Sequence, residues 1–404
     1  MNAEMLKGKI STWRRRRASR IDWRRRHARV FALHPELTTP RSVTAEQQHR
    51  ALWRPLGARF SLDTYRVCAN LSGNDDPRYV PEEVFVSELQ GYLYPNPWVR
   101  FLADKNVYDR WFGTSHPGAR ELFPGGFGGQ TPRRRHDSGT SHGMSCFPGT
   151  YLRKVGGRML GPDYNTLTEN DVRAICEELS YPVVCKPSLG SFGGRNISFC
   201  QDKSALISAL DNGTDLVVQE RIRPHDFFAQ FGEVGLNTIR VYCYRPTATG
   251  RFHILNAALR MGRGGSLDNE TAGGIVCHLT DSAGLNAYAV DKYAGVYREH
   301  PDRRIRFTGL AIPDPGGLHD LALSLASCAL GARLVGLDMC MDCDGKWRCV
   351  EINLGIQTIR FAQYAGHPFF GEYTDEVIDG VLAGRSTSKA KRPQGKPARQ
   401  EQNQ

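Results

Sequence analysis

The sequence predicts a protein of mixed α-helices and antiparallel β-strands, and three pairs of strand-like segments carry that prediction. The two members of each pair are separated by a short turn or a glycine-rich loop, as in a hairpin rather than a parallel crossover. Between the pairs lie segments with the apolar spacing and capping signals of helices. The pairs are Tyr181–Lys186 with Asn196–Phe199, Asn237–Tyr244 with Phe252–Met261, and Leu334–Met341 with Trp347–Leu354.

The composition is that of a globular protein with two or three lobes. The chain has 404 residues, of which 40% are hydrophobic and 24% charged. No apolar run approaches the roughly 18 residues that span a bilayer, and no signal-peptide pattern is present. The 11 cysteines are scattered singly, which indicates reduced thiols and a cytoplasmic protein. Cys340 and Cys343 have a CxxC spacing but no second pair nearby, so we do not predict a zinc site.

Positive charge is concentrated at the two ends of the chain. Residues 1–60 hold 15 Lys and Arg against 4 Asp and Glu, and residues 385–404 hold 6 against 1. We predict a basic N-terminal arm with helices over 1–60 and a disordered basic tail over 385–404. Residues 1–30 have three interpretations: a helix on an anionic membrane surface at the inner face of the membrane, a nucleic-acid contact, or a solvated arm or loosely docked first helix. No specific nucleic-acid partner is predicted.

The central part of the chain divides by composition. Residues 61–112 are predicted to be a helical N-terminal segment, with most of the helix over 77–112. Residues 113–150 are rich in Gly, Pro, Ser and His, which predicts a flexible insert. A metal cluster of its histidines is the alternative, but nothing fixes their spacing. Those residues are His116, His136 and His142, with Cys146. Further helices are predicted over 168–179, 203–210 and 316–331.

The hairpin over Leu334–Leu354 offers the most specific chemistry. The dipeptide Asp344-Gly345 is the preferred centre of a two-residue turn. With that centre, Asp338 lies opposite Glu351, and Cys340 lies opposite Cys349. Side chains alternate between faces along a strand. The predicted apolar face holds Val335, Leu337, Met339, Met341, Val350, Ile352 and Leu354, and the polar face holds Asp338, Glu351 and Asn353.

The polar face of this hairpin predicts a magnesium site. Two carboxylates and an amide oxygen without a cation among them repel each other, and Mg²⁺ prefers such ligands together with nucleotide phosphates. The alternative is a solvated face of an edge hairpin.

Residues upstream of the hairpin favour a magnesium–nucleotide site over a solvated surface. Lys186 ends a strand and is followed by the glycine-rich loop 187–195, whose backbone amides can wrap an anion. Arg240 and Arg260 lie on the next strand pair, and arginine suits bidentate contact with phosphate. Taken singly, these features are also typical of a tight turn and of surface ion pairs.

The order of these parts resembles the ATP-grasp superfamily, and more narrowly its sugar-transfer-associated branch, which is related to α-L-glutamate ligases. The similarity covers about residues 100–380 and rests on the order of several short motifs. They are NTIRV from 237, LRMGRGGSLDN from 259, the glycine pair at 273–274, EHPD from 299, IP at 312–313, VGLDM from 335 and VEIN from 350.

The resemblance implies an α+β ATP-grasp fold with two lobes whose antiparallel sheets enclose ATP. It places the ATP-grasp domain at 151–384, with a first lobe over 151–222 and a second over 223–384.

The resemblance also implies roles for individual residues. Lys105 and Lys186 would contact the ATP phosphates, and residues 188–194, including Ser188, Gly190, Gly193 and Gly194, would form the phosphate lid. Gln219, Glu220 and Ile222 would line the adenine and ribose pocket. Arg240 and Arg260, with Asn269, would stabilise the transferring phosphoryl group, and Asp338, Glu351 and Asn353 would hold one or two Mg²⁺.

We therefore predict an ADP-forming ligase that joins a small-molecule carboxylate to an amine or similar nucleophile through an acyl phosphate. Its acceptor is expected to be linked to the cell envelope or to a sugar. One alternative is a kinase on the same scaffold that phosphorylates a hydroxyl. The other is a binding protein whose basic arm contacts a membrane surface or nucleic acid.

Overall fold

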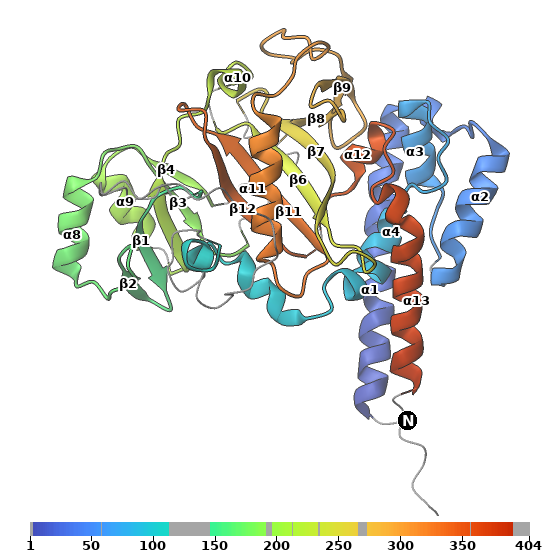
Figure 1. The fold of residues 1–404 in the computed structure, drawn as a ribbon, viewed down its shortest axis with the longest axis horizontal. Coiled ribbons are helices and arrows are strands. Elements are labelled where there is room, and N and C mark those ends of the chain that lie inside the picture. Colours follow the sequence, from blue (N-terminus) through green and yellow to red (C-terminus); the bar gives the residue numbers. More distant parts are fainter. Residues whose placement is uncertain are drawn as a thin grey trace, which may run out of the picture.

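The structure is a computed structural model that describes residues 3–57, 59–112, 146–190, 196–211, 213–232, 235–265, 273–355 and 357–390. It contains a five-stranded sheet in the order β2-β1-β5-β3-β4 and a seven-stranded sheet in the order β10-β9-β8-β7-β6-β11-β12 (Figure 1). The strand pairs within both sheets are antiparallel. The α+β prediction is confirmed, and each of the three predicted strand pairs forms.

The smaller sheet carries its two helices against an apolar core. Cys176 and Leu206 of these helices are fully buried against Leu152 and Val218 of the sheet. The first helix begins as predicted, because Thr168 and Asp171 form a reciprocal capping box. The elements are β1 (Thr150–Val155), β2 (Arg158–Leu160), α8 (Glu169–Glu178), β3 (Val183–Pro187), β4 (Ser198–Cys200), α9 (Lys203–Leu210) and β5 (Leu216–Glu220).

The larger sheet has one apolar and one mixed face. Helix α11 (Pro315–Ser327) buries Leu318 and Ala322 in the cluster that holds Val241 and Leu337 of the sheet. The opposite face carries Asp338, Glu351 and Asn353, the residues of the predicted polar face. The strands are β6 (Thr238–Tyr244), β7 (His253–Met261), β8 (Ile275–Leu279), β9 (Leu285–Val290), β10 (Val296–Tyr297), β11 (Leu334–Met341) and β12 (Trp347–Asn353), and the short helix α10 (Asp226–Ala229) precedes them.

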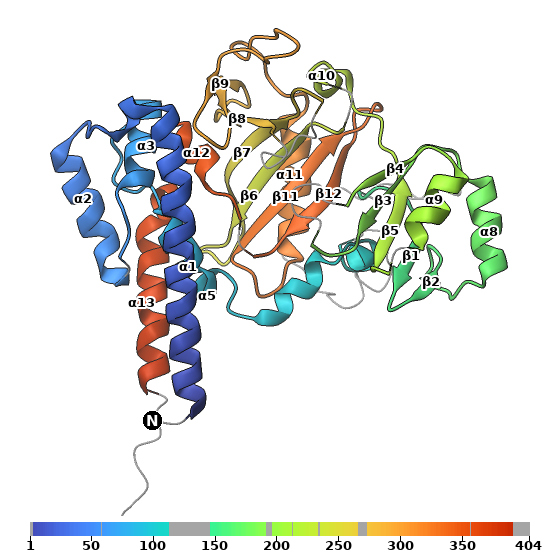
Figure 2. The same cartoon turned by 180° about the vertical axis from the view of Figure 1, so that it is seen from behind.

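Both ends of the chain are helical and lie together. Helices α1 (Ala3–Leu33) and α13 (Thr374–Ala390) run side by side in both views (Figures 1 and 2). Buried Glu88 joins them, since its carboxylate accepts from Arg16 of α1 and Arg385 of α13 at 2.5 Å each. Helix α1 is thus docked rather than a free arm. Around it lie α2 (Val43–Trp53), α3 (Asp63–Ser72), α4 (Glu82–Val84), a π-helical turn (Phe85–Leu89) and α5 (Gln90–Leu93).

Two predicted boundaries need correction. Residues 385–390 continue α13 instead of starting a disordered tail, and 391–404 lie outside the described residues. Residues 113–145 of the insert, with its three histidines, also lie outside them, whereas Phe147 is buried in the core and Thr150 begins β1. None of the described helices is long and apolar enough to cross a membrane.

The predicted helix over 77–112 is broken into short turns. Asn96 and Asp104 each cap a new turn by accepting from a backbone amide two residues on. Such local side-chain bonds compete with a continuous helix. The resulting pieces follow α5 as 3₁₀ turns over Pro97–Ala103 and Lys105–Val107 and helix α6 (Tyr108–Trp111). Lys105 therefore stands at the start of a turn, where its backbone amide donates to the Ser188 carbonyl at 3.0 Å.

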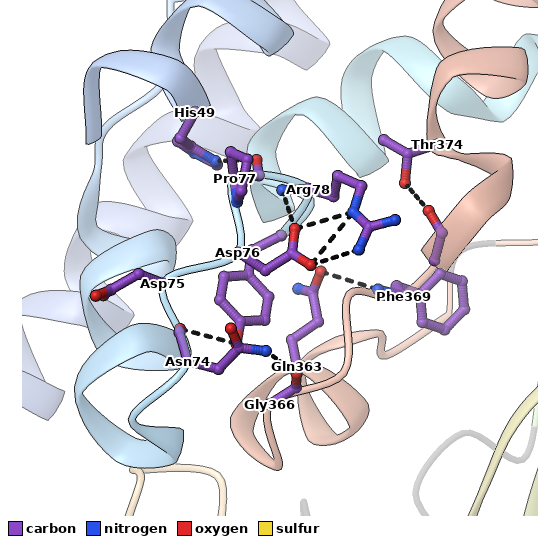
Figure 3. Close-up of polar contacts among 12 residues, drawn as sticks. His49, Asn74, Asp75, Asp76, Pro77, Arg78, Gln363, Gly366, Phe369 and Thr374 are labelled. Atoms are coloured by element: carbon purple, nitrogen blue, oxygen red, sulfur yellow. Dashed lines mark hydrogen bonds and ion pairs between the residues drawn. The ribbon is translucent and has the colours of Figure 1, made fainter. Parts of the chain in front are cut away.

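The turn after helix α12 (Arg360–Tyr364) is tied to the N-terminal helical segment (Figure 3). Gln363 is fully buried, and its side chain accepts from the amide of Val80 at 2.6 Å and donates to the carbonyl of Val80 at 3.2 Å. Asn74 donates to the Gly366 carbonyl at 2.8 Å. The turn after α12 therefore has a fixed position over the mixed face of the larger sheet.

Candidate active site

The β11–β12 hairpin has a different turn from the predicted one, yet it keeps the predicted carboxylate pair. Asp342 pairs with Lys346 through a backbone bond of 2.9 Å, and Gly345 has a φ of +75°. This is a three-residue loop with glycine in the left-handed region. Cys340 consequently lies opposite Arg348, not Cys349.

A register shift between Asp338 and Met339 then restores the predicted pairing. Beyond this bulge, Asp338 lies opposite Glu351 and Gly336 opposite Asn353. The predicted apolar face changes accordingly, because Val350 leaves the core while Trp347 and Cys349 enter it.

Asp338 is held by two arginines from the neighbouring strands. Arg240 lies directly opposite it on β6, and the guanidinium contacts both carboxylate oxygens, with Nη2 at 2.9 Å from Oδ2. Nη1 of Arg260 on β7 lies 2.9 Å from Oδ1. Burial of Asp338 opposes its ionisation, but attraction to the two guanidiniums outweighs burial and holds its pKa well below the usual range. The expectation that no cation lies among the carboxylates is wrong.

Two buried lysines approach the same hairpin from the rest of the chain. Lys105 Nζ lies 2.8 Å from Oε1 of Glu351. Lys186 Nζ donates to the carbonyl of Val350, the bulged residue, at 3.3 Å. Burial, and then the charge of Lys105, lower the pKa of Lys186 to about 8, although Glu351 partly offsets them. Four basic side chains thus surround two carboxylates.

The residues predicted to line the nucleotide base and ribose lie where the smaller sheet meets the larger one. Gln219 is buried and donates to the Pro148 carbonyl at 3.3 Å, while its Oε1 has no partner within the described residues. Glu220 Oε1 accepts from Arg348 of β12 at 2.6 Å and from the Gly149 amide at 2.8 Å. Ile222 is also buried. Their roles stay predictions.

The predicted phosphate lid is described only at its start. The backbone of Ser188 accepts from Lys105 and donates to the Asp215 carbonyl at 3.1 Å. Gly190 has a φ of +73°, which glycine adopts readily. Gly193 and Gly194, and also Asn269, lie outside the described residues.

Two residues that the sequence did not single out shape the site. Arg348 bridges the two sheets, because it binds Glu220 and also Asp342 at 3.1 Å. Gly336 leaves room for the side chain of Gln357. A Cβ atom at position 336 would lie 2.0 Å from Oε1 of Gln357 and would clash with it. A sequence signal for Arg348 would require the true hairpin register, in which it lies opposite Cys340.

Comparison with known protein families decides the identity of this region. Residues 195–371 match the family described as sugar-transfer associated ATP-grasp. These residues belong to that family. No curated protein sequence shows a significant match to the chain.

Among solved structures, the chain is distantly similar to several ligases and synthetases. L-amino acid ligase from Bacillus licheniformis shares 12% identity over 57% of this chain and 43% of that chain, with a TM-score of 0.34. N5-carboxyaminoimidazole ribonucleotide synthetase from Thermotoga maritima shares 12% over 72% and 51%, with a TM-score of 0.34. D-alanine–D-alanine ligase from Bacillus anthracis shares 16% over 55% and 60%, with a TM-score of 0.31. The matched part of each of these proteins is less than two thirds of its length.

The family match and the two antiparallel sheets confirm the predicted ATP-grasp fold. Lys105, Arg240 and Arg260 contact the carboxylates of Asp338 and Glu351, and Lys186 binds the backbone of the same hairpin at Val350. This excess of positive charge suits a polyanion better than a bare divalent cation.

The predicted metal ligands fit magnesium in their chemistry. Asp338, Glu351 and Asn353 supply oxygen donors from one face of the hairpin. Nδ2 of Asn353 is buried without a partner among the described residues, and half a turn of the amide would present its oxygen there. The described residues contain no cluster of three or more His, Cys, Asp or Glu side chains suited to a metal. Magnesium is therefore expected to enter together with phosphate, which would compete with the carboxylates for the arginines and lysines.

Proposed function

We propose that this protein is an ATP- and magnesium-dependent ligase that joins a carboxylate to an amine or similar nucleophile and forms ADP. The observation that carries the proposal is the convergence of Lys105, Lys186, Arg240 and Arg260 on Asp338 and Glu351. Family membership of residues 195–371 supports it. The family's description also supports a sugar-linked acceptor.

The chemistry follows from the charges of these side chains. A carboxylate oxygen of the substrate attacks the γ-phosphorus of ATP, the bond to the bridging oxygen breaks, and ADP leaves. The amine nitrogen then attacks the carbonyl carbon of the acyl phosphate, and phosphate leaves as the amide forms. The lysines and arginines stabilise the phosphoryl charge in a site shielded from water. Magnesium held by Asp338, Glu351 and Asn353 would neutralise further phosphate charge.

Hydroxylamine trapping tests this proposal. The protein is incubated with MgATP, a pool of small carboxylates and hydroxylamine, and the products are separated by mass spectrometry. We expect ADP together with a hydroxamate, because hydroxylamine intercepts an acyl phosphate. A stable phosphate ester without hydroxamate would show a kinase, and AMP as the nucleotide product would contradict the acyl-phosphate route.

The lowered pKa of Lys186 predicts how ATP binding depends on pH. Below a pH of about 8 this lysine is charged and attracts phosphate, and above it the free protein must take up a proton to bind ATP. We expect the affinity for MgATP to fall between pH 7 and pH 9 in the wild type. Lys186→Arg should flatten this change, because arginine stays charged. Calorimetric titrations at the two pH values check the prediction, and an equal slope in both proteins would contradict it.

The membrane contact predicted for residues 1–30 also stays a proposal. Arg14, Arg24 and Arg25 of α1 are exposed, which leaves positive charge on the surface of the docked helix. Co-sedimentation with vesicles containing an anionic lipid, compared at low and high salt, would test it.

A further inference from the structure

A row of five residues crosses the larger sheet from the carboxylate pair to a buried histidine. Glu351, Asp338, Arg240, Ala258 and His278 are successive partners on β12, β11, β6, β7 and β8. Directly opposed residues in antiparallel strands point to the same face. His278 is therefore on the face that carries the candidate active site, two strands beyond Arg240.

The side chains of His278 and its neighbour Asn256 are buried, and their polar atoms have no hydrogen-bond partner in the part of the chain that the structure describes. The exposed fractions of the two residues are 5% and 9%. Neither ring nitrogen of His278, and neither the oxygen nor the nitrogen of the Asn256 amide, has a partner within the described residues. Burying such groups unsatisfied costs free energy, and most buried polar groups in proteins are satisfied.

The two side chains adjoin Arg260 around the smallest residue in the row. Asn256 and Arg260 lie two positions before and after Ala258 on β7, so all three share a face. His278 lies opposite Ala258 and diagonally opposite the other two. Ala258 ends at its Cβ, so the shortest side chain in the row lies between these three polar neighbours on the same face. Arg260 connects this group to Asp338.

His278 is held uncharged in this position. His367, on the segment fixed by Gln363 and Asn74, stacks on it with ring centroids 4.3 Å apart. Burial, and then the proximity of His367, lower the pKa of His278 to about 3. A neutral imidazole has one donor and one acceptor nitrogen, and a carboxamide likewise supplies both kinds of group.

We propose that Asn256, His278 and Arg260 form the acceptor subsite beside the phosphoryl-transfer centre, and that Asn256 and His278 bind an uncharged group that both donates and accepts hydrogen bonds. A hydroxyl or a carboxamide of the acceptor has this chemistry. A carboxylate only accepts and an ammonium only donates, so either would leave part of the pair unsatisfied. Arg260 also repels an ammonium. The inference rests on the proposed ligase function, because it assigns the second substrate of the same site.

Two small probes test the subsite. Methyl α-glucoside supplies hydroxyls and N-acetylglycinamide supplies amides, and each is titrated into the full-length protein with and without MgADP while ligand signals are followed by NMR. We expect at least one probe to bind the wild type, and to bind His278→Phe and Asn256→Leu about five- to tenfold more weakly. The affinity for MgADP should stay within about twofold. His319→Phe is the matched control, since His319 is exposed on α11, which covers the opposite face.

Thermal unfolding separates recognition from a structural role. Removing unsatisfied polar atoms should leave the melting temperature unchanged or raise it, while probe binding weakens. His278→Gln keeps a donor and an acceptor and should bind better than His278→Phe. The inference is overturned if neither probe binds the wild type, or if both variants bind as tightly as the wild type. It is also overturned if probe binding is lost only together with the fold. If the wild type did not bind MgADP, the proposed function would be refuted instead. The titrations of the two probes without nucleotide would still show whether the subsite binds them.

Discussion

Asp338→Asn is expected to lower the free energy of unfolding of the ligand-free protein by about 3 to 5 kcal/mol, because it removes the buried carboxylate that two partly buried guanidiniums share. Urea unfolding at neutral pH measures the loss. The pKa of Asp338 is lowered in the folded protein, so its contribution is present above the unfolded-state pKa of about 3.9 and lost as pH falls toward the folded-state value. The difference between wild type and variant should therefore shrink in acid.

Asp22→Asn is the matched control, since Asp22 forms an exposed ion pair with Arg26 at 3.2 Å within α1. Exposed pairs of this kind contribute at most about 0.5 kcal/mol. If Asp338→Asn were no more destabilising than this control, the ion pairs of Asp338 with Arg240 and Arg260 would not stabilise the fold, contrary to this prediction.

Glu351→Gln is expected to reduce the rate of ADP formation by about 10² to 10³-fold. The change removes a candidate magnesium ligand and also leaves buried Lys105 without the carboxylate 2.8 Å away. The rate is measured as ADP release in the presence of the carboxylate and amine pools, at saturating and at limiting magnesium.

Glu299→Gln serves as the control for this carboxylate-to-amide change, because Glu299 pairs with the exposed Arg304 at 3.1 Å, away from the hairpin. Its rate should stay within about twofold of the wild type. A Glu351→Gln protein that is folded and equally active would remove Glu351 from the catalytic site.

The pairing of Asp338 with Glu351 was predictable from local signals, although two errors offset each other. The dipeptide Asp344-Gly345 indicates a hairpin but not whether its loop has two or three residues. The three-residue loop shifts the register at Cys340, and the bulge at Val350 shifts it back before Asp338. A bulge depends on packing across the strands, so the sequence pattern does not disclose it.

The partners of these carboxylates come from distant parts of the chain. Arg240 meets Asp338 because β6 and β11 pair, and Lys105 meets Glu351 across 246 residues of sequence. The sequence indicated which basic side chains belong to the site. It did not indicate their ion pairs with the carboxylates, because these depend on which strands lie side by side in the folded sheet. For the same reason, the position of His278 beside Ala258 and Arg260 has no local signal.

A calorimetric titration of the wild-type protein with ATP, in the presence and absence of magnesium, tests whether the cluster of basic side chains at the β11–β12 hairpin binds a nucleotide. We expect one ATP per chain, with binding at least about tenfold weaker without magnesium and in the Lys186→Ala protein. A folded wild-type protein that fails to bind ATP, or that binds it equally with Lys186 removed, would contradict the assignment of this cluster as a nucleotide site.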